Sequence, residues 1–288
     1  MQDTTKFVHL TDLHFSSAGT NEPTLLSDTE RAIRNSFAAI DRMAVPPAFI
    51  AISGDLTDRG NLQDYRVLKT LMAELAGTVP LIYALGNHDR RDNFYAVFGG
   101  NETGEALAPY DHDRVMENLH IITMDTSIPG RIGGGLSETQ IAWLGKRLQS
   151  QPDLRKLIVI HHSPLFDLNR ENAWDRLDAR STEALRQAIA GFPVVGILCG
   201  HVHMEEVTHW HGVPVIVGVG HHAATDPLAP QGEIRLVEAT GLSLCTLRPF
   251  GLSVTFVPHP QDRRVLRSIA TDPIMAHDAA ARAAQAAG

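Results

Sequence analysis

Five short groups of metal-ligating residues, each placed directly after an apolar run, constrain the fold of this chain more than any other feature. They are Asp-Leu-His at 12–14, Gly-Asp-Leu-Thr-Asp at 54–58, Gly-Asn-His-Asp at 86–89, His-His at 161–162 and Gly-His-Val-His at 200–203. Short β-branched and aliphatic runs of this kind predict buried strands. The sequence therefore predicts a metal site where five strand ends meet.

The residue types in these groups indicate which metals would bind. Carboxylate, amide and imidazole groups suit divalent first-row ions such as Mn, Fe, Co and Zn. None of the groups contains a cysteine, which argues against a structural zinc site and favours a catalytic one. The candidate ligands are Asp12, His14, Asp55, Asn87, one histidine of the pair 161–162, His201 and His203. These are more ligands than one ion normally takes, so we expect two ions bridged by a carboxylate.

The rest of the chain alternates between apolar strands and amphipathic helices, which predicts βαβ units and parallel pairing. Strands are expected at 7–11, 49–53, 81–85, 121–124, 157–160 and 194–198, and crossover helices at 29–43 and 62–75. Ser137 to Gln140 has the spacing of a helix capping box. After His203, strands are expected at 207–210, 213–219, 233–237, 242–247 and 252–257, with hairpins that complete a second sheet. If the backbone stays extended, Asp12 and His14 share a face, as do His201 and His203.

Composition and charge exclude several classes of function. The chain has 288 residues, 43% of them hydrophobic, which supports one α/β domain at residues 1–260. A formal charge of -8 and a pI near 6.0 argue against a nucleic-acid polymer as partner. We find no signal-peptide pattern and no run of 18 apolar residues, and we expect a cytoplasmic protein without a membrane partner. Two cysteines exclude a disulfide framework.

From about Gln261 the pattern loses strand character, and residues 279–288 are almost entirely alanine. We expect residues 261–288 to form a helical or frayed tail. An arm that packs on another subunit of a homo-oligomer is the alternative. Because no candidate site residue lies in this stretch, deletion of residues 264–288 is expected to leave the chemistry intact.

The five groups resemble the pattern of the calcineurin-like metallophosphoesterase superfamily, which is D-x-H, G-D-x-x-D, G-N-H-D/E, H and G-H-x-H. Within it, residues 135–144, the run His161-His162-Ser163-Pro164-Leu165 and Cys199 before Gly200 are most similar to the class III cyclic nucleotide phosphodiesterase and glycerophosphodiesterase branch. That branch commonly has proline where this chain has Ser163. The resemblance implies a four-layer α/β/β/α sandwich of two mixed sheets.

The resemblance also implies the roles of the site residues. One metal ion would be held by Asp12, His14, Asp55 and His203, and the second by Asp55, Asn87, His161 and His201. The two ions would be divalent or mixed-valence. Asp55, Asn87 and His88 are the expected catalytic residues, and His88 would donate a hydrogen bond to the phosphate or a proton to the leaving alkoxide.

For most of the other polar residues near these groups, the sequence allows two roles. Asp58 either orients a ligand or caps the following helix, and Asp89 either orients His88 or caps the next helix. His162 is expected to pack against the site or support it. His221 and His222 either lie near the substrate or form a surface pair.

The favoured function is hydrolysis of small phosphodiesters, of the cyclic nucleotide or glycerophosphodiester type. A phosphomonoesterase or a nucleotide pyrophosphatase could use the same site. The alternative that is not an enzyme is a non-catalytic scaffold of this fold. Such scaffolds lack metal ligands, whereas all the candidate ligands are present in this chain. Substrate choice is expected to depend on the loops at 15–24, 93–109 and 166–177.

Overall fold

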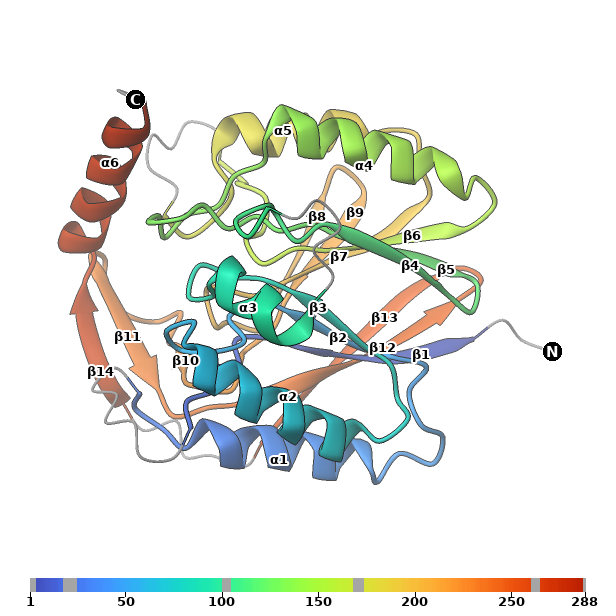
Figure 1. Cartoon of the computed structure of the whole chain (residues 1–288), viewed down its shortest axis with the longest axis horizontal. Helices are drawn as coiled ribbons and strands as arrows, with labels where there is room; N and C mark the ends of the chain where they lie inside the picture. Colours follow the sequence, from blue (N-terminus) through green and yellow to red (C-terminus); the bar gives the residue numbers. More distant parts are fainter. Residues whose placement is uncertain (1–3, 18–24, 100–104, 168–173, 260–264, 287–288) are drawn as a thin grey trace.

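Two stacked sheets with helices on their outer faces form the body of the molecule (Figure 1). The computed structural model describes residues 4–17, 25–99, 105–167, 174–259 and 265–286. Among the described helices, none has the length and apolar character to cross a membrane. The loops expected to select the substrate lie partly outside the described residues.

The first sheet has five strands. In spatial order they are β13 (Gly251–Pro258), β12 (Gly241–Arg248), β1 (Thr5–Leu10), β2 (Ile50–Ser53) and β3 (Leu81–Ala84). Strands β1, β2 and β3 are parallel, and β12 runs antiparallel to β1. The outer face is covered by α1 (Thr29–Ile40) and α2 (Leu62–Ala76), with α3 (Arg91–Phe98) beside α2.

The second sheet has six strands. In spatial order they are β4 (His112–Met116), β5 (Leu119–Thr123), β6 (Arg155–Val159), β7 (Val194–Cys199), β9 (Val213–Val217) and β8 (Glu206–Trp210). Its outer face carries α4 (Glu138–Ser150) and α5 (Ala179–Ile189) (Figure 1). The expected capping box is confirmed, since the Ser137 and Gln140 side chains each bond the other residue's backbone N–H.

Three apolar layers hold these elements together. Between the sheets, Phe7 stacks on Phe49 with ring centroids 4.7 Å apart, and Leu157 and Leu198 pack from the opposite sheet. Separate apolar clusters fill the spaces between each sheet and its helices. Helix, sheet, sheet and helix therefore follow one another, and the expected sandwich is confirmed.

A third, small sheet departs from the sequence expectation. The strands after His203 do not complete one sheet, because β8 and β9 join the six-stranded sheet whereas β12 and β13 extend the five-stranded one. The third sheet consists of β10 (Ala224–Thr225), β11 (Glu233–Val237) and β14 (Val265–Ala270). Strand β14 shows that the expected loss of strand character after residue 261 is wrong. It pairs with β11 over a long sequence separation, which local periodicity does not reveal.

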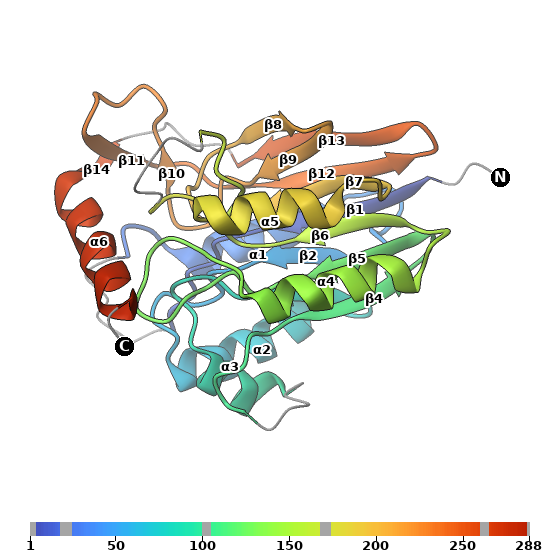
Figure 2. The same cartoon turned by 90° about the horizontal axis from the view of Figure 1, so that it is seen from above.

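The small sheet stands at one end of the sandwich, and α6 (Asp272–Ala286) follows it (Figures 1 and 2). The helical form of this last segment agrees with one of the two expectations for the tail. The N-terminus of β1 points to the opposite end of the molecule (Figure 1). The small sheet therefore lies at the end where β1 finishes, which is also where the ligand groups lie.

Candidate metal centre

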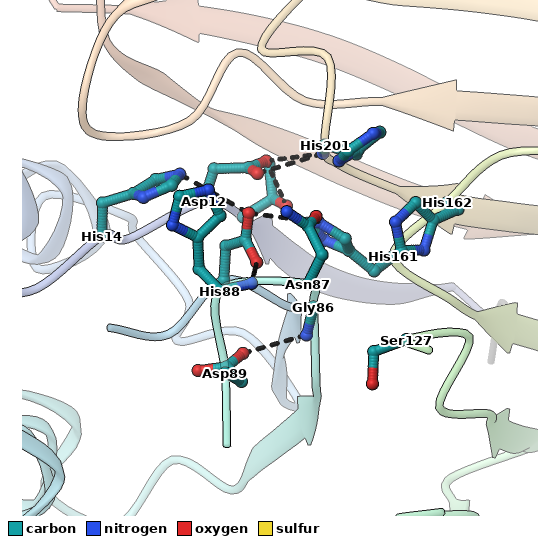
Figure 3. Close-up of polar contacts among 12 residues, drawn as sticks. Asp12, His14, Gly86, Asn87, His88, Asp89, Ser127, His161, His162 and His201 are labelled. Carbon is teal, nitrogen blue, oxygen red and sulfur yellow. Dashed lines mark hydrogen bonds and ion pairs between the residues drawn. The ribbon is translucent and has the colours of Figure 1, made fainter. Parts of the chain in front are cut away.

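The five ligand groups lie together at one edge of the two large sheets. Strands β1, β2, β3, β6 and β7 each end one or two residues before a group. Since the carboxyl ends of parallel strands meet at the same edge of a sheet, the fold brings the groups into contact. Figure 3 shows Asp12, His14, Asn87, His161 and His201 gathered in this region.

The backbone at the ligands is left-handed. The angle φ is 49° at Asp12, 41° at His14, 49° at Asp55, 76° at His201 and 49° at His203. Non-glycine residues rarely adopt this conformation, and it costs about 1–3 kcal/mol at each position. The expectation that Asp12 and His14, and likewise His201 and His203, alternate along an extended strand is therefore wrong. Tight turns after the strand ends aim the side chains instead.

Asp12, His14 and His203 form one side of the cluster. The Nε2 atom of His203 lies 3.3 Å from Oδ1 of Asp12 and 3.1 Å from Nε2 of His14. The Nε2 atom of His14 is in turn 3.6 Å from Oδ2 of Asp55. Three different loops therefore direct nitrogen and oxygen atoms at one point.

Asp55 connects this side to His161 and Asn87. Its Oδ2 atom lies 3.2 Å from Nε2 of His161, which is 3.2 Å from Oδ1 of Asn87. The ring of His201 stands beside His161, with centroids 5.2 Å apart. His201 and His203 thus reach opposite sides of the cluster, in contrast to the expectation that they share one point.

Each of the four candidate histidine ligands is held through one ring nitrogen. His14 Nδ1 lies 3.2 Å from Oδ1 of Asp58. The other three donate to backbone carbonyls: His161 Nδ1 to Ser53, His203 Nδ1 to Ala223 and His201 Nε2 to Trp174. Metal-ligating histidines are usually oriented in this way, because the second nitrogen then keeps its lone pair for the ion. The donor set therefore fits metal binding, and carboxylate and imidazole groups here approach closely enough to hold an ion.

The other buried histidines near the cluster use one or both ring nitrogens in hydrogen bonds within the protein. His162 contacts Thr126 Oγ1 and the Ile132 carbonyl, which leaves no lone pair for a metal. His221 donates to the Thr11 carbonyl and contacts Ser36 Oγ. His222 accepts from the Leu26 N–H. The expectation of a surface pair at 221–222 is wrong, because both side chains are buried against the site loops.

The structure tests the alternative roles that the sequence allows for Asp58 and Asp89. Asp58 contacts His14, and α2 is capped at Asn61, so Asp58 orients a ligand. Asp89 does neither of the two expected things. Its carboxylate accepts hydrogen bonds from the backbone N–H groups of Gly86 and Leu56 and from the Tyr65 hydroxyl. Asp89 thus ties the second ligand loop to the third.

Electrostatics favour a cation in the cluster. Burial alone would raise the pKa of Asp55, but the neighbouring His161 and His88 hold it well below its usual value. Burial likewise opposes charge on His161, yet Asp55 raises its pKa to about 9. Among the described residues, the Asp12 and Asp55 carboxylates form ion pairs with histidines. Positive charge between these groups therefore stabilises both carboxylates.

Two glycines allow the loops to approach the carboxylates. A Cβ atom at Gly86 would collide with the carboxylate and backbone N of Asp55. A Cβ atom at Gly200 would collide with Thr11 Oγ1 and with Asp12 Oδ2. Both glycines are thus required by close contact with a candidate ligand, which is more specific than an ordinary turn.

Sequence reasoning missed a buried chain of hydrogen bonds behind Asp12. Thr11 Oγ1 donates to Asp12 Oδ2 over 2.7 Å and accepts from Ser53 Oγ over 2.8 Å. Ser53 Oγ contacts His9 Nε2 over 2.8 Å. The only signal in the sequence is a hydroxyl residue directly before two of the groups, Thr11 before Asp12 and Ser53 before Gly54.

A further contact accounts for Ser163, whose buried Oγ accepts a hydrogen bond from Nη1 of Arg176.

His88 differs from the other histidines of the cluster because its side chain is exposed. Its side chain is 40% exposed, and its Nδ1 donates to the Asp58 carbonyl over 2.7 Å. It borders a cavity of about 450 Å³ that also exposes His14, Asp55, Asn87, His201 and His203. A ligand in this cavity would contact the metal cluster and His88 together.

Comparison with known proteins agrees with this geometry. Among curated relatives, a probable cyclic nucleotide phosphodiesterase of Rhodopseudomonas palustris is 31% identical over 235 residues, covering 80% of this chain and 83% of the relative. A probable glycerophosphodiester phosphodiesterase of Arcobacter nitrofigilis is 29% identical over 229 residues, covering 76% and 80%. A purple acid phosphatase from yellow lupin seeds shares the fold, with a TM-score of 0.62 and 16% identity over 93% of this chain and 54% of that one.

The family model for calcineurin-like phosphoesterases matches residues 5–205. That stretch contains all five ligand groups and both halves of the cluster. This chain belongs to the calcineurin-like phosphoesterase family.

Proposed function

We propose that the protein is a metal-dependent phosphodiesterase that hydrolyses small-molecule diesters, of the cyclic nucleotide or glycerophosphodiester type. The observation that carries this proposal is the cavity of about 450 Å³ that opens directly onto Asp55, Asn87 and His88. Its size suits a small molecule. The names of the two curated relatives support the same reaction.

The candidate ligands would hold two ions chosen from Mn, Fe, Co and Zn. Asp12, His14, Asp55 and His203 would hold the first, and Asp55, Asn87, His161 and His201 the second. When bound, two such ions lower the pKa of a water molecule and neutralise charge on the phosphoryl oxygens. The chain's contribution is to fix the ligands through the hydrogen bonds on their second ring nitrogens.

His88 would serve the leaving group. Because its Nδ1 donates to the Asp58 carbonyl, its Nε2 is the atom left for the substrate. In the protonated ring, Nε2–H can donate a hydrogen bond to a phosphoryl oxygen or a proton to the departing alkoxide. Asp58 contacts both His14 and His88, so one residue would position a ligand and the acid together.

A second recess favours the monoesterase or pyrophosphatase as the other candidate. It is about 540 Å³, adjoins Asn87 and His88, and is lined by Arg59, Arg131 and His277. The ligand groups themselves contain no lysine or arginine, yet the fold places these cationic side chains next to them. Such groups could balance the second negative charge of a monoester or of a diphosphate.

The experiment that decides is a hydrolysis screen of phosphomonoesters, phosphodiesters and pyrophosphates. The protein is stripped with a chelator and reconstituted with Mn, Fe, Co or Zn. We expect metal-dependent turnover of diesters, abolished in Asp55→Ala and retained in the exposed control Asp153→Ala. Exclusive cleavage of monoesters or pyrophosphates would replace the diesterase proposal by its alternative.

We also place the enzyme in the cytoplasm, which the two buried free thiols Cys199 and Cys245 support.

A further inference from the structure

The cavity beside the metal cluster has two chemically different walls. One wall carries the candidate ligands and His88. The other is mostly apolar and comes from several loops and from the small third sheet. Its apolar lining residues are Ile132, Trp174, Met204, Ile234, Leu236 and Ile269. A phosphate at the metal cluster would therefore have its organic substituent against an apolar surface.

The register of β11 and β14 explains why this surface is apolar. Ile234 lies opposite Ile269, and Leu236 lies opposite Arg267. Because alternate residues of paired strands share a face, these four side chains project from one side of the sheet. Arg235 alternates to the other side, where its guanidinium pairs with Asp226. The pocket side of this strand pair thus presents three aliphatic side chains and one cation, and Glu233 at the start of β11 also lines the cavity.

Trp174 adds an aromatic ring to the apolar lining of the cavity. Its carbonyl accepts the Nε2 hydrogen bond of His201 over 2.9 Å, so its backbone is tied to a candidate ligand. Its side chain lines the same cavity as Ile234 and Ile269. A cavity lined by aromatic and aliphatic groups suits a flat ring, since stacking on such side chains is favourable for any base.

Arg267 adds a polar contact to this surface. It is exposed and lines the cavity, and no hydrogen bond or ion pair involves its guanidinium among the residues that the structure describes. A guanidinium offers several N–H donors and no acceptor. It therefore suits the ring nitrogens and carbonyl oxygens of a heterocycle. Glu233, an acidic residue of β11 that also lines the cavity, is paired with Arg235.

We propose that the paired strands β11 and β14, together with Trp174, form the recognition surface for the substrate's organic group, and that this surface selects diesters of nucleosides over diesters of small polar alcohols such as glycerol. The inference rests on the proposed diesterase function and narrows its substrate class. A glycerol group would leave the aliphatic side chains in contact with water. A purine ring would cover them and accept hydrogen bonds from Arg267.

The test compares two diesters in the metal-reconstituted enzyme: cyclic adenosine monophosphate and glycerophosphoethanolamine. The wild type should show a kcat/KM at least about tenfold higher for the nucleotide, which corresponds to the loss of one ring contact for the glycerol diester. Ile269→Ala and Arg267→Ala should each lower kcat/KM for the nucleotide about fivefold to tenfold, mostly through KM, with less than about twofold change for glycerophosphoethanolamine.

Matched controls separate recognition from folding. Val265→Ala, on the same strand, and Arg114→Ala, on β4, lie outside the cavity lining and should leave both substrates unchanged. Equal losses for both diesters in Ile269→Ala, or a wild type that prefers glycerophosphoethanolamine, would overturn the inference and leave the diesterase proposal standing.

A binding measurement keeps the two proposals distinguishable. Adenosine, which has no phosphate, should bind to the wild type and to Val265→Ala in equilibrium dialysis, and several-fold more weakly to Ile269→Ala. If neither diester were cleaved, the diesterase proposal would fail, whereas this pattern of adenosine binding would still support the recognition surface. Equal adenosine binding by both variants would contradict it.

Discussion

The Oδ2 atom of Asp55 lies 3.2 Å from the Nε2 atom of His161. The same oxygen is 3.6 Å from Nε2 of His14, which belongs to the other half of the cluster. One carboxylate on the loop after β2 therefore touches groups that follow β1 and β6. This contact supports the bridging position that the family resemblance implies and that we propose for Asp55.

The adjacent histidines give a direct test of ligand assignment. His161→Ala should weaken binding of the second ion by far more than about tenfold, because its Nε2 faces Asp55 and Asn87. His162→Ala should mainly lower stability or rate, since both of its ring nitrogens are used within the protein. Metal titration measures the change in ion affinity, and thermal unfolding measures the change in stability. Loss of the ion in His162→Ala alone would exchange the two roles.

A leaving-group series tests the role of His88. His88→Ala should lower the rate about a hundredfold for diesters with alkoxide leaving groups of high pKa, and by less than about fivefold for nitrophenyl esters. The difference arises because only a poor leaving group needs the proton. If all substrates lost the same factor, His88 would position the phosphate and would not act as the acid.

Two truncations separate the contributions of the last segment. The sequence led us to expect that removal of residues 264–288 leaves the chemistry intact, but β14 places Arg267 and Ile269 in the cavity wall. A chain ending at Thr271 should therefore keep most of its turnover of nucleoside diesters. A chain ending at His259 should lose most of it, while circular dichroism shows that the large sheets remain folded. Full activity of the chain that ends at His259 would show that residues 264–288 are not needed for the chemistry, as the sequence predicts.

The ligand groups were accessible to sequence reasoning because each combines a local residue pattern with a strand end. Burial of His221 and His222 was not, since it depends on contacts with Leu26 and Ser36 from a distant part of the chain. The same holds for β14, whose partner β11 lies far away in sequence. Local periodicity contains no information about such pairings.

The backbone at the ligands shows a second limit of sequence reasoning. Asp12 and His14 were expected to converge through strand alternation, and they do lie together around His203, but through left-handed turns. Asp and His adopt a positive φ more often than most non-glycine residues, but their residue types alone do not establish that Asp12 and His14 do so. Asp89 was misread for a related reason, because its partners are backbone N–H groups of another loop.

Asp111 provides a pH-dependent test of packing away from the metals. Burial raises its pKa to about 6, against the hydrogen bonds that it accepts from the Asp125 N–H and the Gln140 amide. A carboxyl whose pKa is higher in the folded state binds protons more tightly there, so it lowers stability as the pH rises from about 4 to about 6. Asp111→Asn should remove this loss, about 3 kcal/mol, while keeping the acceptor oxygen. The difference in unfolding free energy between variant and wild type, measured by denaturant titration from pH 4 to 7, should therefore grow with pH; a constant difference would contradict the raised pKa.

Elemental analysis of purified, metal-reconstituted protein tests whether the chain holds two ions bridged by Asp55. The wild type should hold two ions per chain. Asp55→Ala should lose more metal than His14→Ala, because in the proposed site the Asp55 carboxylate would hold both ions whereas His14 would hold one. Both variants should unfold cooperatively, which shows that the loss is local. Two tightly held ions in Asp55→Ala would contradict the account.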